Sequence, residues 1–396
     1  MRSLITILFT ISCFISAAQP PVKYFNKYGG FGVDIGYGIK ETFDRHYIIV
    51  GSTTSLGAGG SDAYLLLVDS MGQKVWEKGI GSVLGDVAKN VVVNPADSGF
   101  IFTGYTNSYG NGGYDLWLVR TDKLGNVIWQ KTFGGIDWDF GNDLALTSDN
   151  HIIVCGHGYS FGLGAMDGCL LKYDLNGNLI WYKYVGGVND DELRSVISTV
   201  DGKIATVGYT KSKTEPNGDS YFLKYELNGD TIFTRTYGGS GFDFANDLLQ
   251  KPNGEYIFVG SSSSFTTSYG QSIMTSINVT GTVVWTNNFY ASNNTDEEWT
   301  SISENIYNTS MSYYFRNVPV PSFQLNGNVF YSPPFGWPTV VNSFGGFNDE
   351  FIFGSASTSD GGVVCVGYTY SYGSNDKDVY MLKLDSTVGN YQNIIG

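Results

Sequence analysis

The chain has 396 residues, of which 23 are lysine or arginine and 37 are aspartate or glutamate, so its formal net charge is −14. This acidity excludes the basic surface that binding to nucleic acid requires. Beyond the N-terminal segment, no apolar run approaches the length of a membrane-spanning helix. We therefore expect a monomer with no nucleic-acid partner and no transmembrane segment in the mature chain.

Residues 1–18 predict a secretory signal peptide. Arg2 precedes an apolar run over residues 4–15, and the small residues Ser16-Ala17-Ala18 form a cleavage site. The mature protein would then be secreted or associated with the cell envelope. A lipoprotein anchored through Cys13 is the alternative, although the residues before Cys13 fit a lipobox poorly.

The rest of the chain is an internal repeat. A glycine that closes a Gly-Gly pair, or its equivalent, recurs at steps of 51, 54, 52, 52 and 107 residues, at Gly30, Gly81, Gly135, Gly187, Gly239 and Gly346. The last step is about twice the others, so it hides a degenerate copy, with Ala291-Ser292 in place of the glycines. Seven copies therefore fit, over residues 28–78, 79–132, 133–184, 185–236, 237–288, 289–343 and 344–396.

Each copy predicts four short strands, as the third copy illustrates. Residues 143–146 predict its inner strand, and the apolar runs 151–155 and 169–173 predict two strands covered on both faces. Asn176-Gly177 is a hairpin signal, after which Trp181 begins the outer strand.

A period of roughly 50 residues with four strands per unit is typical of a β-propeller blade. We predict an all-β fold, a seven-bladed β-propeller of four-stranded antiparallel blades whose sixth blade is degenerate. Residues 19–396 would form this single domain, because each blade buries its faces against its two neighbours.

Two motifs recur within the repeat. Gly-Tyr-Thr-x-Ser occurs at residues 104–108, 208–212 and 367–371, and Asp-x-x-Gly-x-x-x-Trp occurs at residues 69–76, 122–129 and 174–181. With these motifs the repeat resembles the bacterial SBBP-type β-propeller repeat. The second motif also resembles the tryptophan-docking segment of quinoprotein-type propellers. The resemblance implies the architecture and no particular activity.

The two ends of the chain compete to close the ring. Residues 22–27 copy an outer strand but precede any complete copy, whereas the last copy has three strands and a short tail, 391–396. We expect residues 22–27 to close the ring, because closure removes exposed sheet edges. The tail is the alternative.

Three cysteines follow the signal segment: Cys155, Cys169 and Cys365. In an oxidising compartment an odd number leaves at least one free thiol. A disulfide between Cys155 and Cys169 is one interpretation, because they lie on neighbouring predicted strands. We favour burial as small apolar residues, because no other copy has cysteine in both strands.

One aspartate follows the Gly-Gly pair in nearly every copy, at Asp34, Asp86, Asp139, Asp191, Asp243 and Asp349. A catalytic pair needs two carboxylates in different environments, whereas these recur once per blade. We interpret them as structural acceptors of backbone N–H bonds. No histidine pair has ligand spacing for zinc, and the calcium loop with alternating aspartates is absent. We expect no metal and no cofactor; calcium at an acidic cluster stays an open alternative.

The prediction of function rests on aromatic residues in the longer loops. The longer links of a propeller share one face, and here they hold aromatic residues among Gly, Ser, Thr and Asn. Aromatic planes beside hydroxyl and amide groups suit sugars or peptides, while packing on the neighbouring blade is the structural alternative. The candidate ligand-binding residues are Tyr109, Trp138, Phe161, Trp299, Trp337 and Tyr372.

No nucleophile elbow accompanies a suitable histidine, so nucleophilic catalysis has no support in the sequence. We predict a non-enzymatic protein that binds carbohydrate or protein ligands at the cell envelope or outside the cell. A structural or assembly scaffold of the envelope is the first alternative. A hydrolase or lyase on a propeller scaffold is a more distant one.

Overall fold

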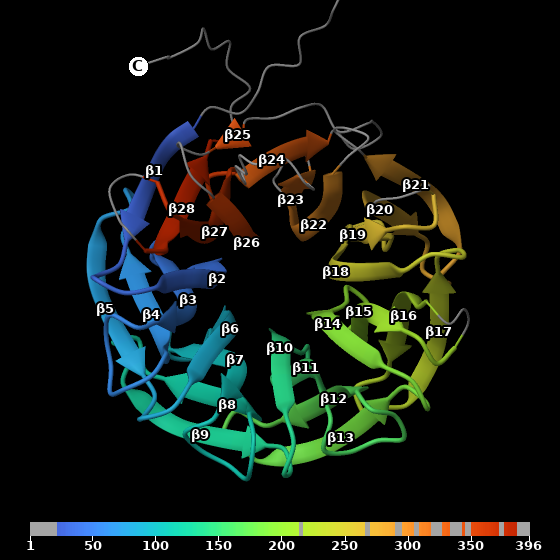
Figure 1. Cartoon of the computed structure of the whole chain (residues 1–396), viewed down its shortest axis with the longest axis horizontal. Helices are drawn as coiled ribbons and strands as arrows, with labels where there is room; N and C mark the ends of the chain where they lie inside the picture. The colour runs from blue at the N-terminus through green and yellow to red at the C-terminus, as the bar shows by residue number, and fades with distance from the viewer. Residues whose placement is uncertain are drawn as a thin grey trace, which may run out of the picture.

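The computed structural model describes residues 22–213, 217–265, 270–289, 295–304, 309–317, 327–332, 343–344, 350–371 and 376–385. The predicted signal segment 1–18, Cys13 and the tail 391–396 lie outside these residues. All helix or strand structure in the described part is strand, as predicted, and the sheets are arranged around a central axis (Figure 1). Within that part there is no helix long and apolar enough to cross a membrane.

Six sheets are regular four-stranded antiparallel blades. Five of them use consecutive strands, in the orders β2-β3-β4-β5, β6-β7-β8-β9, β10-β11-β12-β13, β14-β15-β16-β17 and β18-β19-β20-β21. In chain order, β2–β9 comprise Asp34–Glu41, Tyr47–Thr53, Asp62–Val68, Lys74–Ile80, Asp86–Val93, Phe100–Thr106, Asp115–Thr121 and Val127–Phe133. Likewise β10–β17 comprise Asp139–Leu146, Ile152–Gly158, Asp167–Tyr173, Leu179–Val185, Asp191–Ser198, Ile204–Thr210, Asp219–Tyr225 and Thr231–Tyr237. The fifth blade comprises Asp243–Gln250, Tyr256–Ser262, Gln271–Ile277 and Val283–Phe289.

The sixth regular blade joins the two ends of the chain. It contains β26 (Glu350–Ser357), β27 (Val363–Thr369), β28 (Asp378–Leu384) and β1 (Val22–Tyr28), in the order β1-β28-β27-β26. β1 runs antiparallel to β28, with Phe25 opposite Leu382. The outer strand of this blade therefore comes from the N-terminus, which closes the sheet through hydrogen bonds rather than a covalent link.

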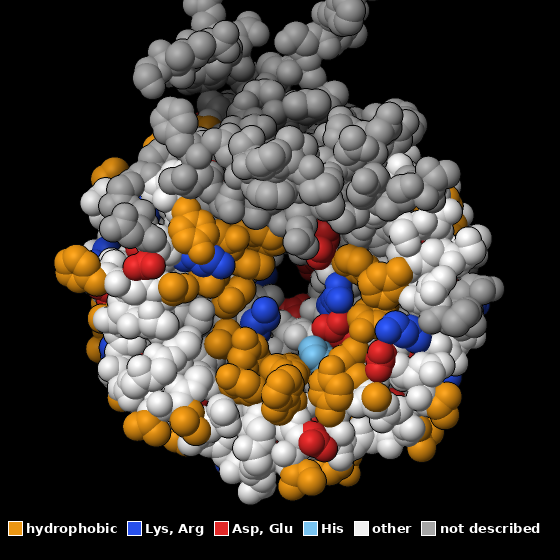
Figure 2. Space-filling model, in the orientation of Figure 1, with side chains coloured by type: hydrophobic (Ala, Val, Ile, Leu, Met, Phe, Trp, Pro, Cys, Tyr) orange, Lys and Arg blue, Asp and Glu red, His pale blue; other side chains and the backbone are white. Residues whose placement is uncertain are grey.

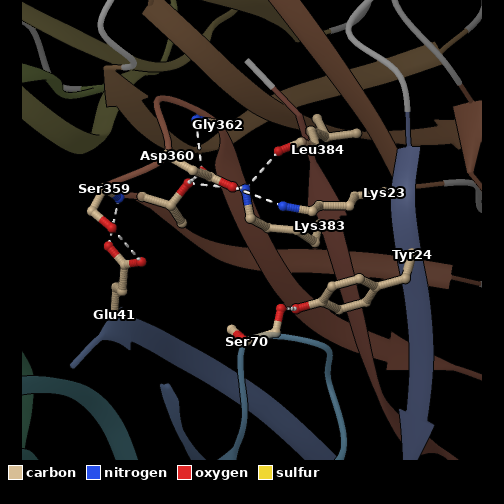
Figure 3. Close-up of polar contacts among 10 residues, drawn as sticks. Lys23, Tyr24, Glu41, Ser70, Ser359, Asp360, Gly362, Lys383 and Leu384 are labelled. Carbon is tan, nitrogen blue, oxygen red and sulfur yellow. Dashed lines mark hydrogen bonds and ion pairs between the residues drawn. The ribbon is translucent and has the colours of Figure 1, made fainter. Parts of the chain in front are cut away.

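Side-chain contacts fasten β1 to the ring (Figure 3). The buried ammonium of Lys383 lies 2.9 Å from Oδ1 of Asp360, and Lys23 of β1 lies 3.1 Å from Oδ2 of the same carboxylate. On the other side of the strand, the hydroxyl of Tyr24 donates to the carbonyl of Ser70 in the neighbouring blade at 3.2 Å. β1 is thus held both to its own sheet and to the next blade.

The sheet β22–β25 corrects the predicted number of blades. β22 (Thr295–Glu304), β23 (Thr309–Asn317) and β24 (Gly327–Ser332) have 10, 9 and 6 residues, and β25 (Ser343–Phe344) has 2. The strands of the other sheets have seven or eight residues. The expectation of a seven-bladed propeller with a degenerate sixth blade is therefore wrong: the structure has six regular blades, and this irregular sheet lies between β18–β21 and β26. The physical reason is that this segment lacks the Gly-Gly pair and the aspartates that define the turns of a blade.

The aspartate at the start of each inner strand anchors two loops, as Asp86 illustrates. Its Oδ2 accepts the N–H of Ser82 at 3.0 Å and the hydroxyl of Ser108 at 2.6 Å, and the hydroxyl of Thr106 donates to Oδ1. The threonine and the serine of the Gly-Tyr-Thr-x-Ser motif therefore donate hydrogen bonds to this carboxylate. Loop contacts of the same kind surround Asp34, Asp191 and Asp243.

These aspartates have the structural role that the repeat predicts. In the blade that joins the chain ends, the position belongs to Glu350, whose Oε1 accepts the hydroxyl of Thr369 at 2.6 Å. Asp349, to which the sequence analysis assigned this role, lies outside the described residues. Because the longer loops converge on these carboxylates, they lie together on one face of the ring, the long-loop face.

The Asp-x-x-Gly-x-x-x-Trp motif, which three blades contain, places a tryptophan against the next blade. The indole N–H of Trp129 donates to the carbonyl of Leu175 at 3.2 Å, and that of Trp181 donates to the carbonyl of Leu227 at 3.1 Å. Gly177 has a φ of 80° and lies directly against the indole ring of Trp129. A Cβ added at Gly177 would lie 3.1 Å from that ring. Glycine is required here both by its backbone conformation and by the close approach of the indole.

The cysteines pack as apolar residues. Cys155, Cys169 and Cys365 are buried free thiols. Gly156, not Cys155, lies opposite Cys169 across β11 and β12. Burial raises the pKa of the Cys155 thiol well above its ordinary value, so this sulfur stays protonated and unreactive.

Docking through the indole nitrogen predicts a measurable difference between tryptophans. Trp181→Phe should lower the free energy of unfolding by about 1 kcal/mol more than Trp76→Phe, because it also removes a hydrogen bond to a partly buried carbonyl. Trp76 is the matched control: it has the same place in its blade, and in the described part of the chain its indole nitrogen makes no hydrogen bond. Urea unfolding measures the free energy of unfolding of both variants. Equal losses in the two would contradict the role given to the indole N–H of Trp181.

Candidate functional site

Every inner strand contains one β-bulge at the same position. The pairing with the second strand shifts between the residues on either side of one extra residue. A bulge leaves that residue out of the ladder and redirects its side chain. The bulge residues are Tyr37, Lys89, Asn142, Arg194, Asn246, Thr300 and Phe353.

All of these bulge residues line one cavity at the centre of the ring. Its volume is about 590 Å³, within the usual range for sites of small ligands. Figure 2 shows hydrophobic side chains around the central opening, with basic, acidic and histidine side chains among them. The fold thus directs one side chain from each sheet into a common space, and these seven side chains are of six different types, which makes this channel mouth the candidate functional site.

Buried carboxylates beneath the bulges tie the inner strands together. Asp143 of β10 accepts the N–H of Leu144 and, from β14, the N–H of Val196, both at 2.8 Å. The side-chain amide of Asn90 on β6 donates to the same carboxylate at 2.5 Å. One carboxylate therefore spans three neighbouring sheets.

Asp247 of β18 repeats this arrangement farther round the ring. It accepts the hydroxyl of Ser195 on β14 at 2.9 Å, and the N–H of Ile302 and the hydroxyl of Ser301 on β22 at 2.8 and 3.0 Å. Ser301 continues the chain to the hydroxyl of Ser355 on β26 at 2.8 Å. We call this run of contacts the belt; it holds the bulges, and so the site, in a fixed register.

Charged and amide side chains form a network on one side of the mouth. Nε of Arg194 donates to Glu192 at 2.9 Å, and its terminal nitrogen donates to Oδ1 of Asn246 at 2.6 Å. The Asn246 amide in turn donates to Glu298 at 2.6 Å. The guanidinium lies 4.6 Å from the ring of Phe244, so its charge is balanced by a carboxylate and by an aromatic face.

Histidine joins the network through an amide. Nδ1 of His157 lies 3.1 Å from the Asn142 amide nitrogen and 3.3 Å from Oε1 of Glu192. Burial lowers the pKa of His157 despite the nearby Glu192, so the ring is neutral at neutral pH. Within the described residues, no group of three or more Asp, Glu, His or Cys side chains could hold a metal ion.

The pKa values of the two glutamates at the mouth are shifted in opposite directions. Burial raises the pKa of Glu298 above its ordinary value, although Arg194 opposes the shift. Burial also acts to raise the pKa of Glu192, but the charge of Arg194 and the hydrogen bonds from Arg194 and Asn142 oppose it, and the net shift is downward. Glu192 is therefore the ionised partner of the arginine, while Glu298 holds a proton to higher pH.

Aromatic rings surround the mouth outside this network. Phe140 and Tyr105 have ring centroids 5.0 Å apart, and Phe140 and His157 also lie at 5.0 Å. Elsewhere around the opening, the ring of Tyr37 lies 4.8 Å from that of Phe353. The site therefore combines flat apolar faces with amides and charges.

The structure places the predicted ligand-binding residues in different environments. Trp138 is 56% exposed and meets the ring of Tyr114 at the edge of the mouth. Phe161 is 43% exposed but lies toward the outer strands, where it packs on Tyr184. Tyr109 is partly buried and stacks on Trp117 at 5.8 Å. Trp138 lies beside the aromatic rings around the mouth, with its ring centroid 6.5 Å from that of Phe140, but none of these three side chains lines the cavity itself.

The prediction that Trp299 binds a ligand is wrong. Its side chain has 0% exposure and packs with Ile257, Val259, Met274 and Ile302. It is a core residue because the position before the bulge points between sheets rather than into the channel. Trp337 and Tyr372 lie outside the described residues.

The bulge residues are not among the predicted ligand-binding residues, although the sequence contains a signal for them. In the five blades that begin with aspartate, the bulge residue stands three positions after it, and it is tyrosine, lysine, asparagine, arginine and asparagine in turn. The position before it keeps an apolar or small residue in all five blades: glycine, alanine, glycine, leucine and alanine. A position that changes chemistry from copy to copy inside a conserved pattern is where the repeat acquires a specific site.

Comparisons with known proteins give the fold and little more. No family model matches the chain. The regulatory protein FlaEY of Caulobacter vibrioides is 26% identical over 284 residues, which cover 63% of this chain and 28% of that protein. The chain thus spans less than a third of this curated relative.

Solved structures support a propeller. The WD40 domain of Neurospora crassa Pan2 has a TM-score of 0.54 at 12% identity and covers 93% of this chain and 97% of that domain. A fungal alcohol oxidase in complex with copper has a TM-score of 0.55 at 11% identity, over 92% of this chain and 76% of the oxidase. At these identities the likeness shows the propeller fold alone.

The belt predicts a pH dependence of stability. Burial raises the pKa of Asp143 from its ordinary 3.8 to about 6. The folded protein then binds this proton more tightly than the unfolded chain does. The contribution of Asp143 to the free energy of unfolding therefore falls as pH rises from about 4 to about 6, by about 3 kcal/mol in total.

Urea unfolding across this pH range measures the effect, with Asp143→Asn as the reference in which that proton cannot be exchanged. Between pH 4 and pH 6, the free energy of unfolding of the wild type should fall by about 3 kcal/mol more than that of the variant. Other titrating groups are common to both proteins. The same pH dependence in both would show that Asp143 titrates normally.

Proposed function

We propose that this protein is an exported, non-enzymatic binding protein whose ligand docks at the channel mouth on the long-loop face. The observation that carries the proposal is the set of bulges. Each inner strand interrupts its ladder at the same position, and unlike side chains meet there in one cavity. A purely structural ring has no need of a different side chain in each sheet.

The chemistry of the mouth supports a carbohydrate or protein ligand. The amides of Asn142 and Asn246 hold Glu192 and Arg194 in place, so that this carboxylate and this guanidinium can make directed hydrogen bonds to a ligand, while Tyr37 and Phe353 offer flat apolar faces. A few fixed polar groups among aromatic side chains are typical of binding sites. The belt fixes their positions in advance, which lowers the entropic cost of binding.

The N-terminal segment supports the proposed location. Residues 1–18 combine a basic residue, an apolar run and a small-residue cleavage site. We propose that the mature protein works at the cell envelope or outside the cell. An acidic surface suits an exported protein that charge keeps soluble.

Arg194 provides the first test of the site. A glycan array and an envelope pull-down with the mature protein identify a ligand, and titration calorimetry then measures its affinity. Arg194→Gln should weaken binding by about tenfold or more, because it removes a central charged donor. Arg235→Gln, on the outer strand β17, is the matched control and should bind normally. Full affinity in a folded Arg194→Gln protein would place the ligand elsewhere.

A hydrolase or lyase is the second candidate, favoured by one observation. Glu192 and Glu298 lie at the same mouth, and their surroundings shift their pKa values apart, as in pairs of a catalytic acid and base. If the protein cleaves the ligand it binds, Glu298→Gln should abolish turnover while binding persists. Intact ligand after prolonged incubation with the wild type would leave binding as the function.

Export is tested separately by mass analysis of the mature N-terminus. Cleavage after Ala18 should produce a chain that begins at Gln19, because Ser16-Ala17-Ala18 is the small-residue signal. Expression with its native leader in a bacterial host, followed by fractionation, supplies the material. A lipid on Cys13 would instead place the protein on a membrane surface, and an uncleaved cytoplasmic chain would contradict export.

A further inference from the structure

A row of four aromatic rings runs from the cavity onto the long-loop face. Tyr37 of β2 and Phe353 of β26 have centroids 4.8 Å apart, and Phe353 and Phe351 lie at 4.3 Å. Phe351 then stacks on Tyr368 of β27 at 5.9 Å with an interplanar angle of 13°. We call these four residues the aromatic row. Tyr37, Phe351 and Phe353 are partly exposed, and Tyr368 is buried as a support.

A lysine lies over each end of the aromatic row. The ammonium of Lys89 is 4.2 Å from the ring centroid of Tyr37, and the ammonium of Lys377 is 4.2 Å from that of Tyr368. In the described part of the chain, neither ammonium makes a hydrogen bond or an ion pair. This is unlike Lys172, whose buried ammonium lies 2.6 Å from Asp149.

These two cations make no direct ion pair in the described part of the chain, and the carboxylate of Glu192 favours the charge of Lys89 from beyond ion-pair distance. Arg194 is paired with Glu192, and Glu298 is hydrogen-bonded to Asn246. Burial lowers the pKa of Lys89, so its positive charge is held at a cost in hydration that an anion would recover. A bound anion near Lys89 and Lys377 would therefore be stabilised more than at the protein surface.

Building on the proposed function, we infer that the ligand is an acidic carbohydrate, whose sugar rings lie along the aromatic row and whose carboxylates contact Lys89 and Lys377. The C–H faces of a sugar ring pack flat on aromatic planes, and successive acidic sugars present carboxylates at intervals along a chain. Two cations separated by a row of aromatic rings match that alternation. An acidic peptide fits less well, because the row provides flat faces rather than pockets for alternate side chains.

Paired ligands separate charge from sugar shape. The probes are oligosaccharides of galacturonate, glucuronate, mannuronate and guluronate, each beside its methyl ester, which keeps the sugar and removes the charge. We expect at least one free acid to bind about tenfold or more tightly than its ester. Added salt should weaken binding of the acid and leave that of the ester nearly unchanged.

Variants assign the preference to the two lysines. Lys89→Met and Lys377→Met should each bring the affinity for the acid close to that for the ester, while Lys89→Arg, which keeps the charge, should retain the preference. Lys123→Met is the matched control, because Lys123 is an exposed lysine in the turn between β8 and β9 on the opposite face. Thermal melts establish that each variant is folded.

The outcomes distinguish this inference from the proposed function. Equal binding of acid and ester, with loss of both in Arg194→Gln, would overturn the acidic ligand and keep the channel mouth as the site. Binding of a hexaglutamate peptide in preference to every saccharide would overturn the carbohydrate. An acid preference that survives both lysine substitutions would overturn the assignment to Lys89 and Lys377.

Discussion

The bridging carboxylates of the belt are the constraint on which the centre of this ring depends. Asp143 accepts hydrogen bonds from groups on three sheets, and Asp247 does the same farther round. Sheets packed face to face can slide, whereas a buried carboxylate that accepts directed bonds from its neighbours permits one register. In the five sheets that begin with β6, β10, β14, β18 and β22, the bulge residue directly precedes a residue of the belt. Fixing the belt therefore also fixes where Arg194 and Asn246 point.

The repeat separates what holds the ring together from what the ring presents. Aspartates such as Asp86 organise the loops, and indoles such as Trp181 dock one blade on the next. These contacts recur from blade to blade, so each tolerates little change. The bulge residue takes no part in the ladder, and its side chain is free to vary without cost to the sheet. Variation confined to that position creates a specific site on a repetitive scaffold.

Charge is arranged unevenly over this acidic protein. Buried lysines such as Lys172 and Lys383 reach aspartates on the face opposite the long loops and serve the fold. At the mouth, Lys89 and Lys377 lie instead over aromatic rings. A local positive potential within a negative molecule favours an anionic ligand at that one place and disfavours it elsewhere, which contributes specificity as well as attraction.

The sequence by itself determined the strands, their grouping in fours and the structural role of the repeated aspartates, because these follow from local periodicity and turn chemistry. It overestimated the number of full blades, since the spacing of Gly346 counts residues and does not reveal that residues 343–344 make a strand of only two. It also placed Trp299 on the surface, although that ring is core. Only the tertiary structure decided the site. Lys89, Arg194 and Phe353 are far apart in sequence, and they meet because bulges turn side chains from separate sheets toward one axis, a juxtaposition that no local pattern encodes.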